Sequence, residues 1–162
     1  MARRVFFIFH YERDIWRANV VRNSWVTKER EAAGFWDASL WEEAQKKGEE
    51  AIKKMIEDGL KNTSVATVLI GKETSGRKWV RYEVRRSHED GKGLLAVYIH
   101  GIEDNSGKTD EKGDTYFGEI GTDANGKSVY FSQLYPTYDW IADKGYDNFG
   151  DWVEKAAKKA GR

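Results

Sequence analysis

Three short runs of nearly continuous hydrophobic residues punctuate the chain, at residues 5–9, 65–70 and 94–99. Each run is rich in β-branched and aromatic residues, and none alternates regularly between polar and apolar positions. Continuous apolar runs of this length are typical of strands that are covered on both faces of a sheet. We therefore expect three central, parallel strands.

Other hydrophobic residues recur every three or four positions, which is the spacing of one buried helix face. This pattern predicts helices over residues 14–25, 49–61, 77–89 and 149–160. Strands that alternate with helices are joined by right-handed crossovers and build a parallel sheet. The expected fold class is therefore α/β: a three-layer α/β/α arrangement with a small, doubly wound, mainly parallel sheet of the flavodoxin-like type.

Some segments depart from this alternation. Residues 27–47 show no sustained period, so we expect an ordered loop or a short irregular element there. Residues 103–125 are rich in glycine and polar residues, and the short run 128–131 that follows predicts an added edge strand or a hairpin. Asp147 or Asn148 is expected to cap the last helix.

The composition narrows the class of protein. Lysine plus arginine and aspartate plus glutamate both number 27, so no overall positive field draws the chain to nucleic acid. Cysteine is absent, and the apolar run at residues 5–9 is too short for a signal peptide or a membrane span. We expect a single cytoplasmic domain over residues 1–162, without membrane partners. Seven Trp and eight Tyr exceed the needs of a core and indicate a pocket or an interface.

Ligands of open α/β sheets bind where the strands end, which directs attention to residues 10–14, 71–76 and 100–104. Gly71 and Gly76 have the spacing of a phosphate-binding Walker loop, but Arg-Lys follows them instead of Lys-Ser or Lys-Thr. The second apolar run is not followed by the aspartate of a receiver domain, and the first is not followed by a flavin phosphate loop. These three activities are therefore not supported.

Trp79 and Glu83 are four residues apart and share one face of a predicted helix near the sheet edge. Taken singly, a helical glutamate is more often a solvated carboxylate, and a tryptophan is more often a core residue. His10 has no second His or Cys nearby, which makes it a poor metal ligand. Glu12 and Asp14 are able to hold Mg²⁺, but such a pair more often caps a helix. Spacing alone leaves a ligand site and a structural role open.

Short segments spread from the first predicted strand to the third make the chain resemble a known family. These segments are residues 5–14, 21–24, 68–71, 77–84 and 93–100, together with Thr74. They are similar to the TIR-like proteins related to the Thoeris antiviral sensor subunit. The Trp-x-x-x-Glu element of Trp79 and Glu83 also resembles that of TIR domains that cleave NAD⁺.

The resemblance implies a TIR-like enzyme of antiphage defence that cleaves NAD⁺ between nicotinamide and ribose, with Glu83 as the catalytic carboxylate. His10, Tyr11, Ser75 and Trp79 are the expected substrate-binding residues. The expected product is a cyclic ADP-ribose isomer that acts as a messenger for a separate effector. NAD⁺ is then the substrate, and neither a metal nor a cofactor is required. TIR-like contacts also imply self-association.

Two other hypotheses remain open. The chain is a TIR-type assembly module that binds without catalysis, in which case the aromatic residues 34–36 and Trp41 serve contacts between copies. Alternatively, it is an enzyme similar to nucleoside deoxyribosyltransferases, which also place a carboxylate at a sheet edge. Activity on deoxynucleosides distinguishes the latter from NAD⁺ cleavage.

Overall fold

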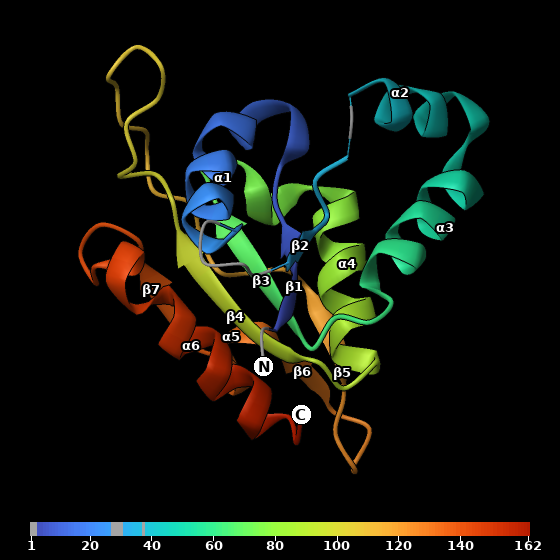
Figure 1. Ribbon diagram of the computed structural model, residues 1–162. Coiled ribbons are helices and arrows are strands. Elements are labelled where there is room, and N and C mark those ends of the chain that lie inside the picture. Colours follow the sequence, from blue (N-terminus) through green and yellow to red (C-terminus); the bar gives the residue numbers. More distant parts are fainter. Residues whose placement is uncertain (1–2, 27–30, 37) are drawn as a thin grey trace.

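The computed structural model describes residues 3–26, 31–36 and 38–162, and its centre is a five-stranded sheet (Figure 1). The strand order is β2-β1-β3-β4-β7, and every pairing in this sheet is parallel. The strands are β1 (Arg4–Ile8), β2 (Glu31–Ala33), β3 (Val65–Ile70), β4 (Gly93–Tyr98) and β7 (Thr137–Asp139). The chain changes direction across the sheet between β1 and β3, which is the expected doubly wound, flavodoxin-like order.

Helices cover both faces of the sheet. The helices are α1 (Tyr11–Val26), α2 (Ala38–Lys47), α3 (Glu49–Leu60), α4 (Lys78–Glu89), α5 (Phe131–Leu134) and α6 (Gly145–Lys159), with a 3₁₀ turn η1 at Thr74–Gly76. On β1, Phe7 packs toward α1 and α6, whereas Phe6 and Ile8 pack toward α3 and α4. Successive strand residues point to opposite faces, so one apolar run supplies two cores. The predicted three-layer α/β/α class is confirmed.

The three predicted central strands lie within one residue of their observed bounds, because all of them are buried on both sides. All six residues of β3 are buried between β1 and β4, with Val65 opposite Val5 on one side and Gly93 on the other. The predicted helices are also present. The capping prediction for Asp147 or Asn148 is wrong, since α6 begins earlier, at Gly145, which packs against the ring of Trp140.

The expectation of a loop or irregular element over residues 27–47 is wrong for its described part. Residues 31–33 form the edge strand β2, which pairs with β1, and residues 38–47 form α2. A three-residue strand is too short to show a period of two, and its pairing with β1 is invisible in local sequence. Residues 27–30 and 37 lie outside the described residues.

The predicted hairpin is confirmed, but it does not extend the main sheet. β5 (Glu119–Thr122) and β6 (Ser128–Tyr130) pair antiparallel as a separate two-stranded sheet that packs against α4. The main sheet instead gains β7 beside β4, a strand of three residues that periodicity does not reveal. Among the described residues, no helix has both the length and the hydrophobicity needed to cross a bilayer.

Candidate active site

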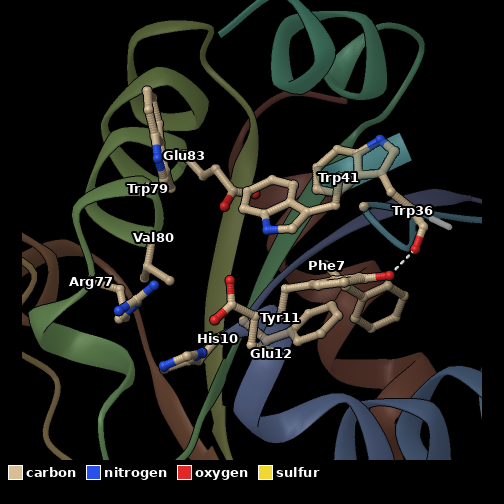
Figure 2. Close-up of a pocket in the computed structure, with 12 residues that line it drawn as sticks. Phe7, His10, Tyr11, Glu12, Trp36, Trp41, Arg77, Trp79, Val80 and Glu83 are labelled. Atoms are coloured by element: carbon tan, nitrogen blue, oxygen red, sulfur yellow. Dashed lines mark hydrogen bonds between the residues drawn. The ribbon is translucent and has the colours of Figure 1, made fainter. Parts of the chain in front are cut away.

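A pocket opens at the carboxyl end of the sheet, where the strand order reverses between β1 and β3 (Figure 2). It is lined by Phe7, Phe9, His10, Tyr11, Glu12, Gly34, Trp36, Trp41, Arg77, Trp79, Val80 and Glu83. These residues come from the ends of β1 and β2, from the start of α1, from α2 and from the first half of α4 with the residue before it. Such switch points are the usual ligand sites of open parallel sheets.

Glu83 is the buried acid of this pocket. The face of α4 that packs on the sheet includes Val80 and Val84, and Glu83 shares that face, so its exposed fraction is only 4%. No described residue forms a hydrogen bond or an ion pair with its carboxyl. Burial in this apolar site raises the pKa of Glu83 well above the usual value of a glutamate. The interpretation of Glu83 as a solvated surface carboxylate is therefore wrong.

His10 and Arg77 form the polar rim opposite Glu83. His10 is 8% exposed, and its pKa is lowered first by burial and then by the positive charge of Arg77. The backbone N–H of Arg13 donates to Nδ1 of His10 at 3.4 Å, which places any imidazole proton on Nε2. The rim therefore offers one permanent cation and a histidine that is neutral at neutral pH.

Aromatic rings from β2 and α2 fill most of the pocket. The indoles of Trp36 and Trp41 stack at 5.8 Å, and the ring of Tyr11 lies 5.6 Å from that of Trp41. The hydroxyl of Tyr11 donates to the carbonyl oxygen of Trp36. The free volume of the pocket is only about 30 Å³, which is room for about two water molecules. Aromatic side chains thus leave little free space around Glu83.

Trp41, like Trp36 and Arg77, is a pocket residue that sequence reasoning did not place in the site. Its indole lies beside the Glu83 carboxyl in Figure 2, and its buried Nε1 has no hydrogen-bond partner among the residues that the structure describes. The surplus of tryptophan was the only signal in the sequence, and it indicated a pocket or an interface without choosing between them. A buried donor without a partner is costly, which favours a polar ligand atom at this position.

The structure brings four of the five predicted site residues together. His10, Tyr11, Trp79 and Glu83 line the pocket, whereas Ser75 lies outside its lining, in η1, where its carbonyl oxygen accepts from Arg81 Nε at 2.7 Å. Trp79 stands at the outer rim, and its ring packs against Tyr82 and away from the Glu83 carboxyl (Figure 2). The roles of all five residues in binding or catalysis stay predictions.

Behind the pocket, Asp14 connects α1 to the loop after β3. Its carboxyl is 1% exposed and is bonded by Arg13 at 3.1 Å and by the hydroxyl of Thr74 at 3.4 Å. Burial is the largest influence on Asp14, and it raises the pKa of this carboxyl. The backbone N–H of Gly71 donates to the same Thr74 hydroxyl at 2.8 Å. Asp14 therefore fixes the turn that leads into α4, and it lies within the first turn of α1 rather than at its cap position.

The chemistry available in the pocket is that of one buried acid, Glu83, among flat rings, with the exposed Glu12 at its edge. In the described part of the chain, no group of three or more His, Asp or Glu side chains is arranged to hold a metal ion. A buried carboxyl without a counterion favours a ligand that carries its own positive charge. Stacked indoles and a tyrosine favour a ligand that contains a ring.

The fold and the site define an α/β protein with a buried acid at the switch point of a parallel sheet, which is the class suggested by the sequence. Comparison with known families narrows this class: residues 6–104 match the family described as the Thoeris protein ThsB, TIR-like domain. A curated relative from Bacillus cereus (strain MSX-D12), named putative cyclic ADP-D-ribose synthase ThsB1, is 39% identical over 191 residues. That alignment covers 94% of this chain and 100% of the relative. The chain belongs to the TIR-like ThsB family of Thoeris proteins.

Proposed function

We propose that this protein cleaves the bond between nicotinamide and ribose in NAD⁺ and that Glu83 is its catalytic carboxylate. Family membership and the name of the Bacillus cereus relative support this class of reaction. The observation that carries the proposal is the burial of Glu83 without any positive partner among the described residues. The nicotinamide ring of NAD⁺ is cationic, so the substrate supplies a positive charge to pair with Glu83.

Cleavage moves this positive charge from the ring to the sugar. The electron pair of the glycosidic bond passes to the ring nitrogen, nicotinamide leaves as a neutral molecule, and the ribose becomes an oxocarbenium-like cation. A carboxylate held near the anomeric carbon stabilises that cation more than it stabilises the ground state. Glu83 is able to act by charge alone, by orienting ribose hydroxyls, or by transient attack on the anomeric carbon.

The elevated pKa of Glu83 fits a carboxyl whose ionisation is favoured by substrate binding. In the free pocket, burial favours the neutral acid. An adjacent pyridinium cation favours the carboxylate, so binding of NAD⁺ lowers the pKa of Glu83 and releases a proton to solvent. A permanent counterion beside Glu83 would take the place of the substrate in so small a pocket. This arrangement needs no such counterion.

The remaining site residues position the substrate. Arg77, exposed at the rim, is suited to contact the pyrophosphate, and His10 lies beside it as a neutral hydrogen-bonding group. Tyr11 donates a hydrogen bond to the carbonyl of Trp36. It thereby positions the aromatic wall of the pocket, which is formed by the stacked indoles of Trp36 and Trp41. Trp79 borders the outer side of the entrance. Ser75 acts indirectly, through the turn that precedes α4.

The aromatic wall must move to admit the substrate, because the free space of about 30 Å³ is far below the few hundred Å³ of a typical ligand pocket. Displacement of the Trp36 and Trp41 indoles opens the pocket from the side of β2 and α2. Their return over the bound ribose excludes water, which favours attack by a hydroxyl of the same molecule over hydrolysis. The product is then a cyclic ADP-ribose isomer, a messenger for a separate effector in antiphage defence.

The test is incubation of the purified protein with NAD⁺ at high protein concentration, followed by chromatography with mass detection. We expect nicotinamide release by the wild type and loss of at least about a hundredfold in rate for Glu83→Gln, the scale of removing a charge-stabilising group. Glu89→Gln, on the exposed side of the same helix, is the matched control and retains the activity. Equal nicotinamide release by wild type and Glu83→Gln contradicts the assignment of Glu83.

The second product distinguishes the outcomes of the reaction. A cyclic isomer supports messenger synthesis, and ADP-ribose supports hydrolysis. Cleavage of deoxynucleosides with no action on NAD⁺ supports the transferase alternative. The assembly alternative needs Trp41 on the surface for contacts between copies. Trp41 is only 8% exposed and lines the pocket, which does not support that role. Self-association is a separate proposal, tested by light scattering of the purified protein.

A further inference from the structure

A second cavity lies at the opposite end of the sheet from Glu83. Its lining includes Gly93 and Leu94, the first residues of β4, whereas the Glu83 pocket follows the carboxyl end of β1. The free volume of this cavity is about 730 Å³, within the usual range for ligand pockets. Its walls are the end of α4, the start of β4, the α5 segment and the last turns of α6.

The cavity exists because β7 covers only the second half of β4. Pairing begins at Ala96, opposite Thr137, so the first residues of β4 have no neighbouring strand on that side. Gly93 donates to Ser64 on the β3 side, and Ala96 donates to Pro136 on the β7 side. Because these directions alternate along a strand, the N–H and C=O of Leu94 point toward the open side. The cavity therefore presents main-chain groups that no strand pairs.

The charge of the lining is positive. Lys92, Lys155, Lys159 and His88 line the cavity, and no aspartate or glutamate is among the described lining residues. Lys92 donates to the carbonyls of Leu60 and Thr63, and Lys159 donates to that of Leu134. Lys155 is exposed and has no hydrogen bond or ion pair with any described residue. Its ammonium group is available to an anion.

The rest of the lining is apolar and aromatic. Tyr138 and Trp152 stack face to face, with ring centres 4.1 Å apart and planes within 5°. Nδ1 of His88 and the hydroxyl of Tyr135 share a hydrogen bond of 2.5 Å, and Leu134 is 39% exposed at the mouth. Flat rings, a free ammonium group and unpaired main-chain groups in one cavity match a ligand that is both aromatic and anionic.

We propose that this cavity is a second binding site, for a small aromatic anion of about mononucleotide size. Its chemistry differs from that of the Glu83 pocket, where a buried carboxyl without a described counterion favours a positively charged ring. The two sites are also separated along the chain: Glu83 lies in the middle of α4 and His88 lies near its end. The proposal does not depend on NAD⁺ cleavage.

The test is titration of the full chain with AMP and with 2-naphthoate, monitored through the indole N–H resonances of Trp152 and Trp41 in NMR spectra. Trp152→Phe and Trp41→Phe variants assign the two signals. We expect at least one of the anions to shift the Trp152 resonance with a Kd of about 1 mM or tighter. A shift of Trp41 alone reports the Glu83 pocket and overturns the proposal, as does the absence of any shift.

Charge variants on one helix face provide the control. Lys155→Glu is expected to weaken binding by at least about fivefold, about 1 kcal/mol, through loss of attraction and gain of repulsion. Lys158→Glu makes the same charge change on α6 at an exposed residue outside the lining, and it is expected to leave the affinity within about twofold. Equal weakening by both variants, or equal affinity for uncharged adenosine and AMP, overturns the anion site.

Discussion

At the scale of single residues, Glu83 is the centre of the proposed mechanism. Its carboxyl is removed from water without compensation, although buried acids are usually paired or hydrogen-bonded. Such a residue weakens the fold, which is the expected cost of a group kept ready for a ligand. Sequence spacing placed Glu83 beside Trp79 on one helix face. It did not reveal burial, because that depends on how α2 and α4 meet over the sheet.

The first prediction concerns the stability of Glu83→Gln. The pKa of Glu83 is raised in the folded protein, so the folded state holds the proton more tightly than the unfolded chain does. The free energy of unfolding therefore falls as the pH rises above the ordinary glutamate pKa, and stability is lost toward neutral pH. Glu83→Gln removes this loss. We expect a higher Tm at neutral pH, with about 2–4 °C gained per kcal/mol.

Calorimetry at several pH values measures this effect. The gain in Tm of Glu83→Gln over wild type is expected to shrink as the pH falls, because protonation neutralises the wild-type carboxyl. Glu89→Gln, exposed on the same helix, is expected to change stability by less than about 0.5 kcal/mol at every pH. A Tm of Glu83→Gln below that of wild type at neutral pH contradicts an uncompensated carboxyl.

The second prediction concerns the indole N–H of Trp41. Trp41→Phe keeps an aromatic ring in the wall but removes a buried donor that has no partner, a group whose burial costs about 1–3 kcal/mol. We expect little change in Tm, because this relief offsets the smaller ring. If the N–H binds the substrate, KM for NAD⁺ rises several-fold. Trp16→Phe, at a 51% exposed position, leaves both quantities unchanged, and an unaltered KM in Trp41→Phe excludes that contact.

At the scale of elements, the sequence pattern predicted the strands that are buried on both faces and the helices that have one buried face. β1, β3, β4 and α4 were predictable because each carries its own periodic or continuous apolar signal. β2 and β7 were not, since each has three residues and owes its existence to a neighbouring strand. The aromatic wall was not predicted because α2, which carries Trp41, follows the unpredicted strand β2. The position of α2 beside Glu83 depends on tertiary packing, which local sequence does not reveal.

The third prediction tests the turn between β3 and α4, which positions the helix of Glu83. A Cβ added to Gly71 stands 2.2 Å from a carboxyl oxygen of the buried Asp14, so Gly71→Ala forces the two elements apart. We expect a loss of about 1–3 kcal/mol or more. Gly76→Ala, five residues later in the same turn, meets no atom within 4 Å and is expected to be nearly neutral. Chemical denaturation of both variants measures the difference.

At the scale of the whole molecule, α1 holds the long loop after β4 against the active-site end of the sheet. Arg17 is 8% exposed and donates to the carbonyls of Ile102 and Lys108 at 2.7 and 2.8 Å. Arg13 bonds Asp110 at 2.7 Å in the same loop. The loop then passes so close to β3 that a Cβ on Gly113 stands 2.1 Å from the carbonyl oxygen of Gly71. Glycine-rich composition predicted a loop here, but not this attachment.

The fourth prediction is that Arg17→Lys loosens this loop. A lysine replaces the planar fork with a single ammonium group, which cannot serve both carbonyls in the same geometry. We expect faster hydrogen exchange and earlier proteolytic cleavage over residues 103–114, with the sheet still protected. Arg85→Lys, on the exposed face of α4, is the matched control. Unchanged exchange in Arg17→Lys contradicts a loop held by α1.

The measurement that tests the central claim most directly is the pH dependence of kcat/KM for nicotinamide release from NAD⁺. Glu83 must ionise to stabilise the ribose cation, and burial raises its pKa in the free protein. The account predicts that kcat/KM rises with pH through a range in which an ordinary glutamate is already fully ionised. An activity that is constant from about pH 5.5 upward, well above the ordinary glutamate pKa of about 4.3, contradicts it.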